Sequence, residues 1–146
     1  MHLRRTSRAT WHGTVGDGDG TMGLGRDRVI VPFSLKSRVG DQPATNPEEL
    51  IAAAHAGCYA MSLTNVLENH GTPPTEVTAE STVHLVQGEG GFSIPTVDLS
   101  CDVVVAGVDH DELTRLAAEA ERSCPVSQLL DAEITLTVRL TEGNES

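Results

Sequence analysis

Aromatic residues are scarce in this sequence: only Trp11, Phe33, Tyr59 and Phe92 occur among 146 residues. The hydrophobic core must therefore consist mainly of Val, Leu, Ile and Ala side chains. Because domains cluster around ~100–150 residues, the length predicts a single domain over residues 1–146. A chain of this length is long enough to bury a sizeable core.

Positive charge is also scarce, with 10 Lys and Arg against 21 Asp and Glu and a formal net charge of -11. We expect no nucleic-acid partner, because neutralising phosphates requires a basic surface. A short basic cluster occurs at Arg4, Arg5 and Arg8, without aromatic neighbours. We interpret it as a solvated N-terminal arm.

Long apolar runs are missing as well. None approaches the ~18–20 residues of a membrane span, and the N-terminus lacks the apolar region of a signal peptide. These features predict a cytoplasmic protein with no membrane partner.

Cysteines are few and odd in number: Cys58, Cys101 and Cys124. This set does not suit a disulfide framework, and no CxxC spacing indicates a zinc site. We therefore expect neither a metal nor a bound cofactor, and the reactivity of the thiols becomes the main question.

The first third of the chain contains short alternating segments and then a long helical pattern. Asn46 is a good N-cap, Pro47 suits the first helical position, and Glu49 completes a capping box. Gly71 ends the pattern near His70. Small residues dominate the middle of this helix, which is therefore expected to be buried on most sides. The expected strands are 8–15, 21–24 and 28–33, and an exposed connection is expected at 34–45.

The remainder of the chain alternates between blocks of strand and helix. Asp109 and Glu112 form a second capping box, and Pro125 separates two helices. Because the strands and helices come in blocks without regular βαβ alternation, the class is α+β. The expected elements are strands at 76–86 and 92–105 joined by a hairpin turn at 87–91, helices at 109–122 and 126–130, a strand at 133–140, and a polar, frayed tail at 141–146.

Two weak motifs have simpler interpretations. Residues 18–23 satisfy GxGxxG, but no helix is expected after them, so we interpret them as a turn rather than a dinucleotide site. His55 and Cys58 lie three residues apart on one helical face and could form a metal-binding or Cys–His pair. A packed or hydrogen-bonded histidine is favoured, because two ligands are half of a tetrahedral site.

The three cysteines differ in their expected surroundings. Cys101 lies on the apolar face of a strand and is interpreted as a core residue. Cys124 lies where one helix ends and another begins, and a helix N-terminus stabilises a thiolate. Cys58 is too deep in its helix for the helix dipole to help. It is either a nucleophile that needs a cation from elsewhere or a small buried residue.

Two segments resemble the OsmC/Ohr family, the osmotically inducible protein C and organic hydroperoxide resistance proteins. The first is NPEELIAAAHAGC at Asn46–Cys58, and the second is SCPVSQLL at Ser123–Leu130 followed by AEITL. Trp11 with Gly13 also fits, and the likeness spans essentially the whole chain. His55 and the VSQ sequence after Pro125 are typical of the OsmC branch.

The resemblance implies an OsmC-like fold, with antiparallel sheets around a long buried central helix in an intertwined homodimer. It implies a peroxidase for organic hydroperoxides, and more weakly for hydrogen peroxide, in oxidative or osmotic stress defence. In these roles Cys58 is the peroxidatic nucleophile and Cys124 the resolving thiol. The resemblance matches Arg38 to the arginine that activates the Cys58 thiolate and Glu48 to the glutamate that orients this arginine. Lys36, two residues from Arg38, is a second cation in the same loop.

The chemistry fits these roles. A Cys58 thiolate attacking a peroxide leaves a sulfenic acid, which Cys124 condenses to a disulfide. An external dithiol then restores the pair by exchange. The Arg38 guanidinium supplies the cation that the dipole cannot.

Helix geometry adds a further expectation. Glu48 and Cys58 are separated by ten residues, or ~15 Å along a helix. Antiparallel packing of two such helices across a two-fold axis would bring Glu48 of one chain toward Cys58 of the other. We therefore expect composite active sites at a dimer interface. The alternative function is a non-catalytic thiol redox sensor or binding module.

Overall fold

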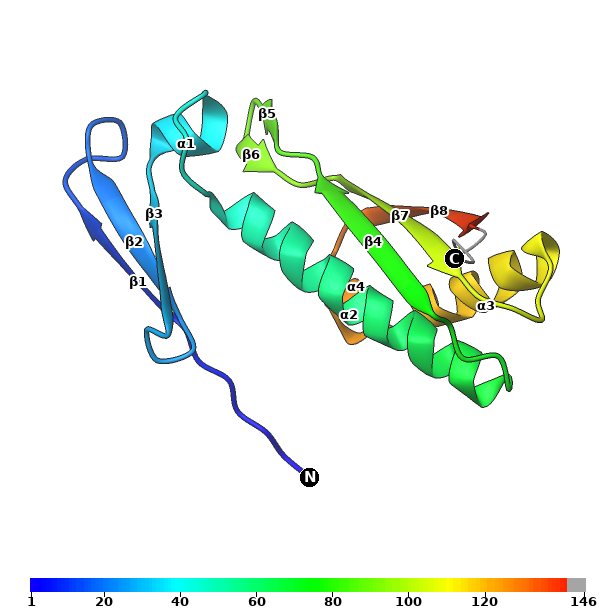
Figure 1. The fold of residues 1–146 in the computed structure, drawn as a ribbon. Helices are drawn as coiled ribbons and strands as arrows, with labels where there is room; N and C mark the ends of the chain where they lie inside the picture. The colour runs from blue at the N-terminus through cyan, green and yellow to red at the C-terminus, as the bar shows by residue number, and fades with distance from the viewer. Residues whose placement is uncertain (142–146) are drawn as a thin grey trace. The chain divides into compact units, whose positions relative to one another are not determined.

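The computed structural model describes residues 1–141 (Figure 1). The tail expected at 141–146 falls outside the described residues, apart from Thr141, which ends a strand. The chain forms two compact units, Met1–Leu50 and a second beginning at Ile51, and each is described by itself. The expectation of a single domain stays a prediction.

The first unit contains a three-stranded antiparallel meander. Its strands are β1 (Arg8–His12), β2 (Asp19–Leu24) and β3 (Val29–Phe33), in the order β1-β2-β3. The Trp11 and Phe33 rings lie 5.3 Å apart between centroids. Gly20 lies beneath both rings, since a Cβ there would be 2.7 Å from Trp11 and 2.9 Å from Phe33.

The GxGxxG segment was expected to be a turn, but most of it forms strand β2. No helix follows it: the next element is β3. The glycines serve the close packing of the meander, because Gly23 pairs with Arg8 and with Ile30 in the two neighbouring strands. The strand explains the pattern without a dinucleotide.

The expected connection at 34–45 contains a short helix that we did not predict, α1 (Leu35–Val39). Ser34 and Ser37 form a reciprocal capping box, in which each side chain accepts a hydrogen bond from the other's backbone N–H. Two serines replace the usual Ser and Glu, which is why the pattern was missed. Ser37 is buried and also donates to the Thr45 carbonyl at 2.8 Å.

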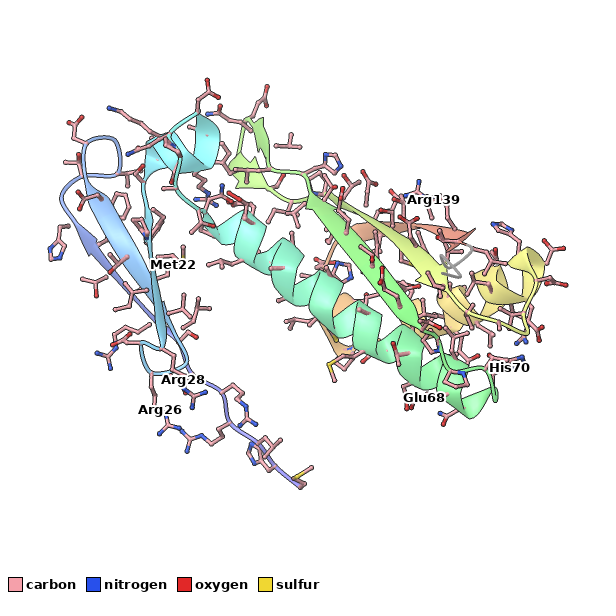
Figure 2. The ribbon with its side chains drawn as sticks, in the orientation of Figure 1. Met22, Arg26, Arg28, Glu68, His70 and Arg139 are labelled. Carbon is pink, nitrogen blue, oxygen red and sulfur yellow. The ribbon has the colours of Figure 1, made fainter. Side chains whose placement is uncertain are left out.

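The long helix is α2 (Pro47–Asn69), with its expected start confirmed. The Asn46 side chain accepts from the Glu49 N–H at 2.9 Å and donates to the Glu49 carboxylate at 2.7 Å. Gly71, in the left-handed region at φ 87°, follows its C-terminal end. His70 lies just beyond that end, and its Nε2 is 2.8 Å from Glu112 (Figure 2).

The second unit contains a mixed sheet of β4 (Glu76–Val83), β7 (Thr96–Val104) and β8 (Glu133–Thr141), in the order β4-β7-β8. β4 pairs antiparallel with β7, but β8 pairs parallel with β7. The expectation of a purely antiparallel sheet was therefore wrong. The helices between β7 and β8 provide the crossover that a parallel pair requires. The expected hairpin turn lies in a separate two-stranded hairpin, β5 (Val86–Gly88) and β6 (Gly91–Ser93).

One face of this sheet carries the core. The apolar residues of β7 alternate as expected, and Cys101 is buried among them, which confirms its interpretation as a core residue. Both α2 and α3 (His110–Ser123) contribute to the same cluster. The buried members of this cluster are Tyr59, Leu63, Val66, Leu67, Leu99, Cys101, Val103, Leu113, Leu116, Ala117, Ala120, Cys124 and Val138.

The opposite face of the sheet is polar. The Arg139 Nε donates to Asp102 at 2.6 Å, and Thr135 donates to Asp98 at 2.6 Å (Figure 2 labels Arg139). These bonds lower the pKa of Asp98 and of Asp102. The face is therefore suited to water, and the core lies on the other side.

The long helix is buried on one face only, which corrects the expectation of burial on most sides. Tyr59, Leu63 and Leu67 are fully buried, whereas Ala53, Gly57 and Met61 belong to an exposed face. By length and composition alone, α2 is apolar enough to cross a membrane, so the statement that no stretch approaches a span was wrong. Its packing against α3 and the sheet identifies it instead as a core helix of a globular fold.

A cysteine pair and an arginine–glutamate pair

Cys58 and Cys124, separated by 66 residues, are brought together in the second unit, where their Sγ atoms lie 3.2 Å apart. Cys58 extends from α2 and is partly exposed, whereas Cys124 is fully buried. Both thiols are free. A small approach of the two sulfurs would therefore close a disulfide, and Cys58 is the one that a solute can reach.

The break between two helices positions Cys124. It is at once the C-cap of α3 and the N-cap of α4 (Pro125–Leu129), with extended backbone at φ -66° and ψ 116°. Pro125 cannot continue α3, because it lacks an N–H, but it suits the first position of α4. The expected helix–proline–helix arrangement is confirmed.

Hydrogen bonds distinguish the two thiols. Burial raises the pKa of Cys58, and Cys124 adds to that rise, although the Val126 N–H and the Ser62 side chain oppose it. Burial also acts to raise the pKa of Cys124, but the hydrogen bonds outweigh it and lower that pKa. The groups that act to lower the pKa of Cys124 are, in order of effect, the Ser127 N–H, Cys58, the Ser127 hydroxyl and the Val126 N–H. Within this unit, then, Cys124 is the better thiolate and Cys58 needs further stabilisation.

Both ring nitrogens of His55 have serine hydroxyls as hydrogen-bond partners. The histidine is fully buried, with Nδ1 3.1 Å from the Ser81 Oγ and Nε2 2.8 Å from the Ser127 Oγ. Burial lowers its pKa, so the neutral imidazole is favoured. The hydrogen-bonded histidine favoured from the sequence is confirmed, and residues 1–141 contain no group of three metal-ligating side chains.

Cys101 is protected from reaction. Burial raises its pKa to about 11, so its thiolate is scarce at neutral pH. The neighbouring Tyr59 is fully buried and donates to the Ala117 carbonyl at 3.0 Å, and burial raises its pKa too. Cys101 is a structural residue beside this bond.

Arg38 and Glu48 form an ion pair within the first unit. The Arg38 Nε and Nη2 donate to one carboxylate oxygen, Glu48 Oε1, at 2.9 Å and 2.6 Å. Glu48 is only 7% exposed. The geometry thus pairs Glu48 with Arg38, the arginine that the resemblance indicated, although the catalytic roles of both stay predictions.

Hydrogen bonds around α1 set this pair in place. The Asn46 side chain donates to the Ser37 carbonyl at 3.1 Å, and the Ser37 hydroxyl donates to the Thr45 carbonyl. These bonds fasten α1 to the residues just before α2, so Arg38 faces Glu48. Sequence reasoning missed Ser37 because its role depends on this folding back of the chain.

Two hollows lie on the first unit. A pocket of about 200 Å³ is lined by Trp11, Val15, Phe33, Leu35 and Arg38, together with Ser34. It offers an apolar wall of aromatic rings beside a guanidinium group.

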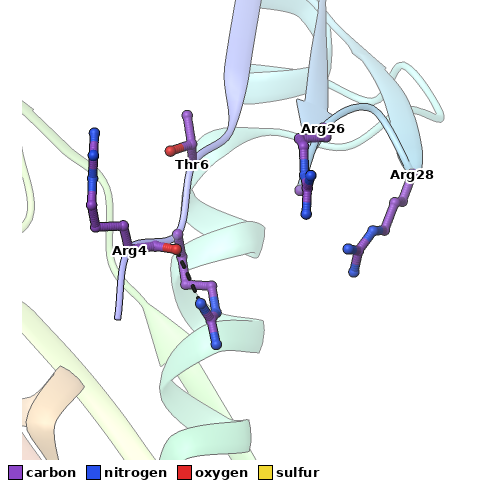
Figure 3. A pocket seen from close by; sticks show the side chains of 6 residues that line it. Arg4, Thr6, Arg26 and Arg28 are labelled. Carbon is purple, nitrogen blue, oxygen red and sulfur yellow. Dashed lines mark hydrogen bonds between the residues drawn. The ribbon is translucent and has the colours of Figure 1, made fainter. Parts of the chain in front are cut away.

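The other hollow is basic, lined by Arg4, Arg5, Arg26 and Arg28 (Figure 3). The Arg4 and Arg5 side chains are exposed, as expected for a solvated arm. The Ser7 hydroxyl accepts from the Gly25 N–H at 3.2 Å, which ties this arm to the β2–β3 turn.

Comparisons with known proteins agree on one family. The model of the OsmC-like protein family matches residues 40–139. The chain is 36% identical to peroxiredoxin OsmC of Escherichia coli, over 96% of this chain and 99% of that one. It is 34% identical to the organic hydroperoxide resistance protein of Xanthomonas axonopodis pv. citri, over 77% of each chain.

Solved structures extend the likeness to the fold. The crystal structure of an organic hydroperoxide resistance protein from Elizabethkingia anophelis superposes with a TM-score of 0.77 at 27% identity, covering 97% of this chain and all of that one. A second such protein, from Legionella pneumophila, gives 0.75 at 26% identity, covering 94% of this chain and 98% of that one. The expected α+β, OsmC-like fold is thereby confirmed, and the intertwined homodimer stays a prediction.

Proposed function

Because the chain belongs to the OsmC-like protein family, we propose that it is a cysteine-based peroxidase that defends the cell against peroxides under oxidative or osmotic stress. Its preferred substrates are organic hydroperoxides, with hydrogen peroxide reduced more weakly. The observation that carries this proposal is the Cys58–Cys124 pair, with sulfurs 3.2 Å apart and only Cys58 open to solvent. Relatives named for peroxiredoxin activity and for organic hydroperoxide resistance support it.

The proposed reaction has three steps. The Cys58 thiolate attacks the distal oxygen of ROOH, the O–O bond breaks, and the products are Cys58 sulfenic acid and an alkoxide that takes a proton to become the alcohol. The Cys124 thiolate then attacks the Cys58 sulfur and displaces hydroxide, which leaves as water after protonation. An external dithiol finally reduces the disulfide by exchange and becomes a disulfide itself.

Activation of Cys58 needs a positive charge, because burial raises the pKa of its thiol. Arg38 supplies that charge in our proposal, and Glu48 holds the guanidinium by accepting two hydrogen bonds on one oxygen. A guanidinium stabilises a thiolate and can donate to the peroxide oxygens. In this proposal the second thiolate needs no such help, because Ser127 and Val126 already stabilise Cys124.

The preference for organic substrates has support in the pocket beside Arg38. Trp11, Phe33 and Leu35 line it with apolar surface, which suits the hydrocarbon part of an alkyl or lipid hydroperoxide. Hydrogen peroxide has no hydrocarbon part, so contact with this apolar surface would add nothing to its binding free energy.

We also propose that the active protein is a homodimer with composite active sites. The exposed face of α2 is made of small residues at helical spacing, including Ala53, Ala54 and Gly57, which allow close approach of a second helix. Met61, exposed to 77%, extends the same face. Antiparallel packing of two copies would place Glu48 and Arg38 of one chain near Cys58 of the other.

The direct test is consumption of cumene hydroperoxide or a lipid hydroperoxide with a dithiol reductant. We expect Cys58→Ser to abolish turnover. Without reductant, Cys124→Ser should consume one equivalent of hydroperoxide and keep Cys58 as sulfenic acid. Cys101→Ala is the matched control and keeps the wild-type rate, since Cys101 is buried in the core. Peptide mapping after peroxide treatment should find a Cys58–Cys124 disulfide with Cys101 free.

Unchanged turnover in Cys58→Ser would overturn the proposal. Stoichiometric oxidation of the Cys58–Cys124 pair without turnover under any dithiol would instead favour the redox sensor or binding module. Slow and unselective oxidation of all three thiols would mean that the cysteines only pack.

A further inference from the structure

The mechanism above makes no use of His55, although it lies close to the resolving cysteine. His55 is fully buried on α2, and both ring nitrogens are within hydrogen-bond distance of serine hydroxyls. One of them, Ser127, is itself only 7% exposed and lies on α4, three residues after Cys124. Hydrogen bonds therefore connect Ser81 of the sheet, His55 and Ser127. Ser127 lies one helical turn after Cys124, the N-cap of α4, and its hydroxyl acts to lower the pKa of that thiol.

The number of available protons fixes the direction of these hydrogen bonds. A neutral imidazole carries one N–H, and each serine hydroxyl donates one proton. If Ser127 donates to the Cys124 thiolate, it cannot also donate to His55, so the Nε2 of His55 must carry the proton and donate to Ser127. Nδ1 is then an acceptor, and the Ser81 hydroxyl must donate to it. Only this one direction satisfies every group while Cys124 is anionic.

We propose that His55 is a positioning residue for Cys124: its Nε2–H holds the Ser127 hydroxyl in the orientation that donates to the resolving thiolate. The residue touches neither substrate nor sulfur and acts through Ser127. The inference deepens the proposed function, and it rests on that function only for the resolving role of Cys124.

The surroundings contain few competing charges. The only contribution that shifts the His55 pKa is burial, which keeps the ring neutral. Around Cys124, the groups that influence its pKa are Ser127, Cys58 and Val126, from α2 and α4, and the buried Tyr59 of α2 also interacts with it. The largest contributions that lower the pKa of Cys124 are hydrogen bonds, and none of these comes from a cation. This makes the donated hydroxyl important.

The arrangement also predicts a change on oxidation. When the Cys124 thiolate displaces hydroxide from the Cys58 sulfenic acid, the negative charge leaves Cys124 and the disulfide forms. Ser127 then loses its anionic acceptor and can turn to donate to His55 Nε2. His55 would shift its proton to Nδ1 and donate to Ser81. Reduction would reverse the change, so the imidazole tautomer follows the redox state of the pair.

The first experiment measures Cys124 alone and needs no peroxidase activity. In a Cys58→Ser, Cys101→Ala background, the ultraviolet absorbance of the thiolate is followed against pH. Because a hydrogen bond to a charged group is lost, we expect Ser127→Ala and His55→Leu each to lower the thiolate fraction about tenfold at neutral pH. The double variant should be no worse than either one, since both act on one bond. His55→Gln, which retains an N–H near the position of Nε2, should restore much of the loss.

Thr64→Val is the matched control. It removes a part-buried side-chain hydrogen bond from the same helix, to the Ala60 carbonyl, and should leave the Cys124 titration unchanged. An unchanged titration in both His55→Leu and Ser127→Ala would overturn the inference, as would equal effects of Thr64→Val. If the titration shifts as expected but no variant reduces peroxides, the proposed function fails and the positioning role stands.

The second experiment uses nitrogen-15 NMR of the full chain. The His55 ring should be the Nε2–H tautomer in the reduced protein and the Nδ1–H tautomer after oxidation of the pair. A purely structural histidine would keep one tautomer in both states, and that result would contradict the switch.

Discussion

Oxidation of the cysteine pair should stabilise the folded chain, by an amount that follows from the topology. Cys58 and Cys124 are 66 residues apart, and a cross-link closing that loop removes chain entropy worth roughly 4 kcal/mol from the unfolded state. The sulfurs must approach by about 1.2 Å, from 3.2 Å to the ~2.05 Å of a disulfide. This movement costs some of the gain, so we expect a net rise of about 2–4 kcal/mol in the unfolding free energy.

Urea unfolding of the reduced protein and of protein oxidised with one equivalent of hydroperoxide measures this difference. With a slope of about 2 kcal/mol per M, the midpoint should rise by about 1–2 M. Both samples need the same protein concentration, because an obligate dimer unfolds in a concentration-dependent way. Cys124→Ser is the control that cannot form the bond, and its midpoint should not rise.

A rise of the same size in Cys124→Ser would show that the stabilisation does not come from this bond. A midpoint that fails to rise in the wild type, although mapping shows the disulfide, would refute the reasoning from loop closure. A fall would mean that the bond strains the break between α3 and α4 more than it constrains the unfolded chain.

Three other predictions concern the ion pair, the buried histidine and the exposed helix face. Glu48→Gln should reduce kcat/KM for an organic hydroperoxide roughly tenfold, because it weakens the charged hydrogen bonds that hold Arg38. Glu49→Gln, on the same helix turn, is the control. Equal losses of kcat/KM in both variants would argue against a role for the Arg38–Glu48 pair. His55 has a folded pKa below the ordinary 6.5, so the unfolded chain takes up this proton first and the unfolding free energy should fall as pH drops below 6.5, by at most about 1.4 kcal/mol per pH unit. His55→Gln should flatten this part of the wild-type pH profile, and identical slopes would contradict a buried neutral imidazole. If the proposed dimer forms through the exposed face of α2, Ala54→Arg should convert it to monomer in sedimentation, whereas Ala106→Arg, at an exposed loop site, should not. A dimer that survives Ala54→Arg would place the interface elsewhere.

Local sequence signals predicted most of the secondary structure. The caps at Asn46 and Asp109 and the proline at 125 mark helix boundaries that the structure reproduces within a residue or two. Such signals are reliable because capping satisfies backbone groups within a few residues of the cap. The helix α1 was missed because its cap uses two serines, and the parallel β7–β8 pairing was missed because strand direction depends on a crossover rather than on any local pattern.

The candidate site was predicted only in part. The family motif named Cys58, Cys124, Arg38 and Glu48, and the structure places the first two in contact and pairs the last two with each other. Ser127 was quoted within the motif but received no role. Its proposed role depends on a hydrogen bond with His55, 72 residues away in the chain, and no local spacing predicts such a contact.

By itself, the sequence determined the α+β class, the capped helices, the core position of Cys101 and the family. These depend on periodicity, capping and motifs, which are set by residues close together in the sequence. Only the tertiary structure decided that the sulfurs lie 3.2 Å apart, that Cys124 is fully buried while Cys58 is partly exposed, and that a buried histidine is hydrogen-bonded to Ser127. Reactivity follows from burial and from hydrogen bonds between distant segments, and those arise only when α2, α3 and α4 pack on one face of the sheet.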